Sequence, residues 1–209
     1  MSDSPDFDMP PSESVECPRG LAVCVAGISG VGKSTLLKAH VGDAAGPDRQ
    51  LTGSSVVKAI IAPATVQDFD GWPEAERVAV RDEAIRRLHS LRSTSPGILL
   101  IDGHFSLRNR HSGVIEPVFT PADKAFYGAL VLLEATALEV LAWRQRDQRD
   151  RGPTTLQHLD EELLAERHYA GVIAREMAVP LLRISTADPH VRLSELRVFL
   201  NGLRQPQAM

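Results

Sequence analysis

Nine residues, Gly27–Thr35, have the types and spacing of a phosphate-binding loop. They fit the pattern G-x-x-x-x-G-K-[ST], which places Lys33 and Ser34 directly after the second fixed glycine. Glycines let neighbouring N–H groups converge on phosphate oxygens at a helix N-terminus. We expect Lys33 to reach the β- and γ-phosphates of ATP and the Ser34 hydroxyl to ligate Mg²⁺. The expected ATP-binding residues are Gly27, Ser29, Gly30, Val31, Gly32, Lys33, Ser34 and Thr35.

The segments on either side of this loop are those that such chemistry needs. Residues 21–26 form a continuous apolar run, which is typical of a buried parallel strand. Residues 35–40 predict a short helix after the loop. The alternative is a glycine-rich turn with a chance Lys-Ser pair, and the strand and helix together argue against it.

Asp102 is the second candidate for chemistry, because it ends the apolar strand predicted over 98–101. In P-loop proteins an acidic residue here holds Mg²⁺ or accepts a proton from the attacking hydroxyl. The alternative is a turn role, since Asp-Gly is a common turn pair. Because the loop, Asp102 and Glu134 all follow predicted strands, a parallel sheet would bring them to one crevice.

Arginines gather where one predicted helix ends and a loop begins. Guanidinium groups stabilise the charge that develops during phosphoryl transfer, and the Gly152-Pro153 pair after them resembles a hinge. We therefore expect a mobile lid over about 143–156. The alternative is a solvated helix face with local ion pairs to interleaved aspartates. The expected catalytic arginines are Arg144, Arg146, Arg149 and Arg151, alongside Lys33 and Asp102.

Four further residues are candidates for binding the phosphoryl acceptor. Ser54 opens a predicted helix, and His104 follows Asp102 closely. Arg108 and Arg110 lie in the next loop, where they either grip a phosphate of the acceptor or face water.

Apolar strands and helices alternate along the chain, which predicts an α/β fold with a parallel sheet covered on both faces. We expect a disordered tail over 1–19, rich in Ser, Pro and acidic residues, and one domain over 20–205. Further strands are predicted over 50–52, 130–133 and 180–184. Helices are predicted over 54–61, 73–92, from 121, 136–150, 154–177 and 189–203, and an irregular loop over 105–119.

Composition argues against several classes of protein, although it leaves a local basic groove open. The 209 residues carry a formal net charge of −4, which argues against a surface that coats nucleic acid. The spacing of Cys17 and Cys24 fits no metal or redox motif, so we expect reduced cysteines in a cytoplasmic protein. No signal segment or membrane span is visible. We expect a monomer or homodimer.

The sequence resembles the archaeal-type adenylate kinases, a branch of the P-loop nucleoside monophosphate kinases. Besides the glycine loop, the likeness rests on segments 52–57, 101–104, 106–108, 132–134 and 143–147. The resemblance implies a five-stranded parallel sheet of the three-layer P-loop NTPase fold, ATP·Mg²⁺ as donor and a closing lid. Asp70-Gly71-Trp72 stands where the family tends to carry an arginine for the acceptor phosphate. Arg108 is therefore the best remaining candidate for that role, with Arg110 behind it.

Three functions follow from these residues. The leading one is a kinase that moves the γ-phosphoryl group of ATP to a nucleotide or similar small acceptor. A second is a kinase for a hydroxyl on a nucleoside, a nucleic-acid end or another metabolite, with Asp102 as the base. A third is a nucleotide-dependent switch or binding subunit, against which the chain lacks an Asn-Lys-x-Asp guanine-specificity motif.

Overall fold

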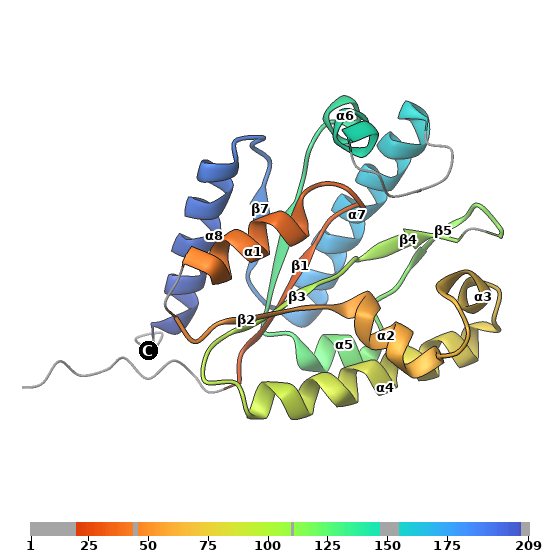
Figure 1. Cartoon of the computed structure of the whole chain (residues 1–209), viewed down its shortest axis with the longest axis horizontal. Coiled ribbons are helices and arrows are strands. Elements are labelled where there is room, and N and C mark those ends of the chain that lie inside the picture. Colours follow the sequence, from red (N-terminus) through yellow and green to blue (C-terminus); the bar gives the residue numbers. More distant parts are fainter. Residues whose placement is uncertain (1–19, 44–45, 110, 147–154, 206–209) are drawn as a thin grey trace, which may run out of the picture.

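The computed structural model describes residues 20–43, 46–109, 111–146 and 155–205, which are built around one sheet (Figure 1). The sheet has five strands in the order β2-β3-β1-β6-β7, and every neighbouring pair runs parallel. The predicted five-stranded parallel α/β sheet is thereby confirmed. The strands are β1 (Ala22–Ala26), β2 (Arg49–Thr52), β3 (Leu99–Asp102), β6 (Ala129–Leu133) and β7 (Leu181–Ile184).

Helices cover both faces of this sheet, which explains why its central strands are apolar along their whole length. Val23 and Val25 pack on the face covered by α1 and α8, while Ala22, Cys24 and Ala26 pack toward α4, α5 and α7. No helix of the described residues is both long and apolar enough to cross a membrane. The helices are α1 (Lys33–Asp43), α2 (Gly53–Ile61), α3 (Val66–Asp70), α4 (Glu74–Ser93), α5 (Pro121–Phe126), α6 (Ala137–Arg146), α7 (Leu156–Met177) and α8 (Pro189–Arg204).

The strand register brings chemically useful residues to one edge of the sheet. Asp102 is paired with Val25 of β1 on one side and with Thr52 of β2 on the other. Because β1 leads directly into the glycine loop and β2 leads into α2, the carboxyl end of β3 lies between them. This edge is where a ligand is expected in an open parallel sheet.

The segment predicted as an irregular loop over 105–119 instead contains an antiparallel hairpin, so that prediction was wrong. Its strands are β4 (Ser106–Arg108) and β5 (Ile115–Pro117). Three residues are too few for the alternation of side chains to be recognised in a sequence. The turn has a recognisable signature, because the Asn109 side chain accepts two backbone N–H groups and Gly113 adopts a φ of 72°.

Three helical details also differ from expectation. The short helix α3 was not predicted, although a capping box between Thr65 and Asp68 begins it. The helix predicted from residue 154 begins slightly later, because its N-cap is Thr155 and α7 starts at Leu156. The sequence of α4 predicts a buried apolar stripe that includes Leu91, with Arg and Glu on the other face. Leu91 is instead 40% exposed, and the neighbouring Arg92 lies over the ring of Phe126. The predicted tail and most of the predicted lid lie outside the described residues.

A buried carboxylate joins three parts of the fold away from the glycine loop. Asp48 accepts hydrogen bonds from His40 of α1, from Arg204 at the end of α8 and from the backbone N–H of Ile98 before β3. Burial alone would raise the pKa of Asp48, but these hydrogen bonds outweigh it and lower the pKa to about 2 from an ordinary 3.8. Folding therefore favours the ionised form.

We predict that Asp48→Asn lowers the free energy of unfolding at pH 7 by about 2 kcal/mol, since one pKa unit corresponds to about 1.4 kcal/mol. The stabilisation is complete above pH 3.8 and is lost as the pH falls through about 2, so wild type and variant should converge there. Urea unfolding at pH 7 and pH 2.5 measures this, with exposed Asp160→Asn as the control. If Asp48→Asn lowers the free energy of unfolding equally at both pH values, ionised Asp48 is not the source of the stabilisation.

Candidate functional site

The glycine loop between β1 and α1 has a backbone that only glycine allows at two key positions. Gly27 has a φ of 146°, and a Cβ there would lie 2.5 Å from the carbonyl oxygen of Leu133 in β6. Gly32 has a φ of 100°, and a Cβ there would lie 3.2 Å from the Arg192 guanidinium. These two glycines let the loop bend back tightly against its neighbours, so that α1 begins at Lys33 with its N-terminus beside the loop.

Lys33 is buried under the loop, with 6% of its surface exposed. Its Nζ donates to the carbonyl oxygens of Gly27 (2.7 Å) and Ile28 (3.3 Å), and it lies 3.7 Å from an Asp102 carboxylate oxygen. Burial lowers the pKa of Lys33, and Asp102 acts in the opposite direction. The ammonium is thus held at the centre of the loop, where a phosphate would replace the two carbonyls as its partner.

Ser34 and Asp102, 68 residues apart in the sequence, are in direct contact. The Ser34 hydroxyl donates to Asp102 Oδ2 at 2.5 Å, a length typical of a charge-assisted O–H···O⁻ hydrogen bond. A hydroxyl and a carboxylate are both oxygen ligands of the kind that Mg²⁺ prefers. The described residues hold no group of three or more acidic, His or Cys side chains suited to a metal. This set fits Mg²⁺, because that ion takes few protein ligands and completes its shell with water and substrate phosphates.

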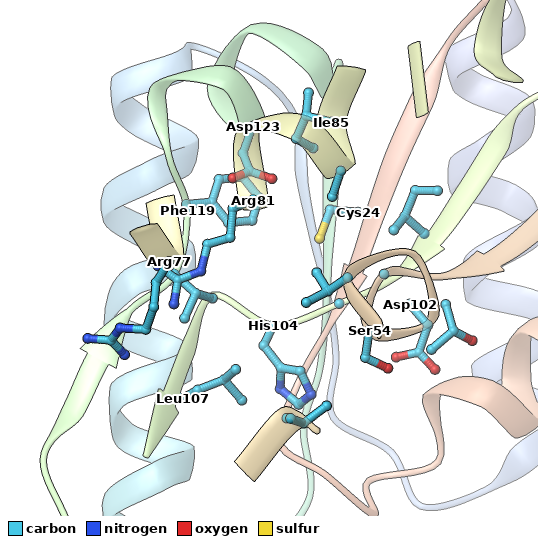
Figure 2. A pocket seen from close by; sticks show the side chains of 18 of the residues that line it. Cys24, Ser54, Arg77, Arg81, Ile85, Asp102, His104, Leu107, Phe119 and Asp123 are labelled. Carbon is cyan, nitrogen blue, oxygen red and sulfur yellow. The ribbon is translucent and has the colours of Figure 1, made fainter. Parts of the chain in front are cut away.

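A cavity of about 220 Å³ lies on the other side of Asp102, between α2, α4 and the hairpin. Figure 2 shows Ser54 and Asp102 at one end, with Arg77, Arg81 and Asp123 at the other. Much of the wall between these ends is apolar, from side chains such as Val57, Val66, Phe69, Ile85, Leu88 and Phe119. The cavity can therefore hold a small molecule whose reactive end lies near Asp102.

His104 lies in the wall of this cavity, beside Asp102 in the chain. Its Nδ1 is 3.1 Å from Glu166 of α7, and the other Glu166 oxygen accepts the backbone N–H of Phe105 at 2.8 Å. Burial lowers the pKa of His104, and Lys33 adds to that effect. Glu166 is 2% exposed, so this contact fixes His104 against the long helix. Ser54 and His104, both predicted acceptor-binding residues, thus line the same cavity.

Arg108 also lines the cavity, but its guanidinium is already occupied. It lies 2.6 Å from Glu161 and 3.3 Å from Glu162 of α7, and it donates to the carbonyl of Gly113. These contacts attach the hairpin to α7. Arg110, the second cation expected here, lies outside the described residues.

The arginines of the predicted lid are only partly described. Arg144 donates from Nε and Nη2 to the carbonyl oxygen of Ser29 in the glycine loop, at 2.9 and 2.7 Å, and also lies 3.5 Å from Glu162. Arg146 is the last residue of α6 and is exposed. Arg149 and Arg151 lie outside the described residues. Of the two arginines of this group that the structure describes, Arg144 contacts the glycine loop.

Arg192, which was not predicted as a site residue, holds the glycine loop in place through hydrogen bonds to backbone carbonyls. Its guanidinium donates to the backbone carbonyls of Val31, Glu134 and Thr186, and lies 5.3 Å from the ring centre of Trp143 on α6. It is 6% exposed. These contacts tie the glycine loop to the ends of β6 and β7. Nothing in the sequence separates Arg192 from the other arginines on helices.

Arg77 and Arg81 are the other missed residues, because α4 was expected to turn its charged side chains to solvent. Both line the cavity, and Arg77 is 9% exposed. At the same end of the cavity (Figure 2), burial raises the pKa of Asp123 to about 6, despite hydrogen bonds from Thr120 and the charge of Arg81. Their spacing of four residues, with Ala84 and Ile85 following, was the available signal.

The fold and site together define a P-loop kinase-like α/β protein. Residues 26–160 match the AAA domain family, and the chain belongs to that family. The structure is similar to a 1.7 Å crystal structure of shikimate kinase from Bacteroides thetaiotaomicron, with a TM-score of 0.57 and 12% sequence identity. The similarity covers 87% of this chain and 98% of that one, and at this identity it concerns the fold. No curated protein matches the sequence. The finer resemblance to archaeal-type adenylate kinases stays a prediction.

We predict that Arg192→Lys weakens ATP binding on the order of tenfold, because one ammonium cannot reach three carbonyls arranged around a planar guanidinium. The loop would then present its N–H groups less rigidly to the phosphates. Titration of ATP onto the purified variant measures this, with Arg175→Lys on the exposed end of α7 as the control. An unchanged dissociation constant for ATP would show that the glycine loop does not need the hydrogen bonds of Arg192.

Proposed function

We propose that this protein is an ATP- and Mg²⁺-dependent phosphotransferase that acts on a small acceptor. The observation that carries the proposal is the position of Asp102, which contacts Lys33 and Ser34 of the glycine loop and also lines the acceptor-sized cavity. Phosphoryl transfer needs donor and acceptor to meet in line at one point. A carboxylate shared by the two sites marks where that point would be.

In this proposal the chain's own groups have separate tasks. The loop N–H groups and Lys33 bind and neutralise the β- and γ-phosphates. Ser34 and Asp102 would hold Mg²⁺, which neutralises charge on the phosphates when bound. Ser54 and His104 face the acceptor, while α2, α4 and the hairpin exclude water from it. Arg144 lies beside the loop and would contact the transferred group as negative charge develops.

The cavity is also what distinguishes this proposal from a nucleotide-dependent switch or binding subunit. A switch needs to bind and release a nucleotide, and it has no use for an apolar cavity that begins at the catalytic carboxylate. Fast transfer to an added small molecule would favour the kinase. Slow hydrolysis coupled to the binding of a partner would favour the switch.

Lys33→Ala tests the donor site most simply. We expect turnover of ATP to fall on the order of 10²-fold or more, as when one preorganised electrostatic group is removed from an active site. Asp102→Asn should lower turnover at least as much, because the carboxylate charge acts both toward the glycine loop and toward the cavity. Lys38→Ala, an exposed change five residues further along α1, serves as the control in the same ADP-formation assay. Near-wild-type turnover in Lys33→Ala would refute the donor site.

Arg144 should matter more for the chemical step than for resting ATP affinity, because contacts to developing charge strengthen in the transition state. We predict that Arg144→Ala lowers kcat about tenfold or more and changes the ATP dissociation constant about threefold or less. Exposed Arg86→Ala on α4 provides the control. If Ala substitutions at Arg144, Arg146, Arg149 and Arg151 all leave kcat unchanged, the arginines form a solvated helix face and the lid proposal fails.

A further inference from the structure

We infer that the acceptor is a compact, largely apolar alcohol that carries no phosphate, so that the reaction makes a phosphate ester and not a phosphoanhydride. The inference rests on the proposed function and names its substrate class. It follows from the charges of the cavity, from the partners of its arginines and from its apolar wall.

The charged side chains that line the cavity do not favour an anion. Among the described lining residues, four are acidic and three are arginines, so their formal sum is −1 when all are ionised. A nucleotide brings about two negative charges on its phosphate at neutral pH. The cavity would repel such a group unless one of its arginines were available. The acidic residues are Asp70, Asp102, Glu116 and Asp123, and the arginines are Arg77, Arg81 and Arg108.

Each of these arginines is already paired with at least one carboxylate. Arg77 lies 2.5 Å from Glu74 and 2.9 Å from Glu116, and Arg81 lies 3.2 Å from Glu74. Arg108 is held by two glutamates of α7. A phosphate at these guanidinium groups would share them with the carboxylates that already pair with them, and the negative charges would then repel one another.

One buried donor of these arginines has no hydrogen-bond partner among the described residues. The Nε of Arg77 is buried and makes no hydrogen bond within the described part of the chain. A single N–H suits one uncharged oxygen, such as a second hydroxyl or a carbonyl, better than a phosphate dianion, which needs several donors. The far end of the cavity therefore fits a neutral polar group.

The rest of the cavity fits the body of such an acceptor. Its volume of about 220 Å³ is below the range usual for drug-sized ligands, and Phe69, Phe119 and Leu107 contribute to an apolar wall. Ser54 and Asp102 at the near end can hydrogen-bond a hydroxyl. These features select an alcohol with a small aromatic or aliphatic body.

The chemical step balances with these groups. The acceptor oxygen forms a bond to the γ-phosphorus as the bond from that phosphorus to the β,γ-bridging oxygen breaks, and ADP leaves with the electron pair. The hydroxyl proton passes to the carboxylate of Asp102. The products are ADP and a phosphate monoester of the alcohol.

Matched acceptor pairs test the inference, each pair being an alcohol and the phosphate monoester of the same skeleton. The panel includes benzyl alcohols, short diols and nucleosides with their 5′-monophosphates. Acceptor-dependent ADP formation gives kcat/KM, and ³¹P NMR distinguishes an ester from an anhydride product. We expect one or more alcohols to be preferred at least tenfold over their monophosphates, with an ester as product. Preference for a monophosphate, or an anhydride product, overturns the inference and leaves the proposed function standing.

Absence of transfer to every compound, with ATP still hydrolysed in a Lys33-dependent way, counts against the proposed function and removes the inference with it.

The Glu116→Gln variant tests whether the ion pairs of Arg77 set the preference between alcohols and monophosphates, because it removes one carboxylate that pairs with Arg77. We expect this variant to shift the preference toward monophosphates by about tenfold. Glu83→Gln, at a half-buried position of α4 outside the cavity where the carboxylate pairs with Arg86 and Arg87, is the matched control. No shift in Glu116→Gln would show that the pairing of Arg77 does not set the preference.

Discussion

The hydrogen bond between Ser34 and Asp102 is the contact on which the site depends. It joins the first turn of α1 to the end of β3, and it forms only because those strands are adjacent and parallel. The same carboxylate approaches Lys33 and opens onto the cavity. One side chain thereby sets the distance between the place where phosphates would bind and the place where an acceptor would bind.

Arginines act around this carboxylate in two different ways. Arg144 and Arg192 donate to backbone carbonyls of the glycine loop, so they fix the direction in which the loop's N–H groups point. The arginines of the cavity are paired with glutamates instead, and their charge is largely neutralised there. In the proposed function, the arginines would therefore leave a rigid loop for the phosphates of ATP and a cavity for the acceptor whose described lining has no surplus of positive charge.

Much of the fold could be predicted because its signals are local. Four of the five strands are short, mainly apolar runs, and the glycine loop is a fixed pattern of residue types, so most of the sheet and the position of Asp102 followed from the sequence. The hairpin over 106–117 and the helix α3 were missed because their regular parts are only three to five residues long. The roles of Arg77, Arg81 and Arg192 depend on what they face across the fold, and that information is absent from a single sequence.

A double-mutant cycle between Ser34→Ala and Asp102→Asn, read as the rate of ADP formation, tests most directly whether these two side chains work as one unit. If they do, the double variant should be about as slow as the slower single variant, because removing one partner already disables the other. If the fold reductions in rate of the two single variants multiply in the double variant, Ser34 and Asp102 act independently. That result would contradict the proposal that the two side chains work as one unit.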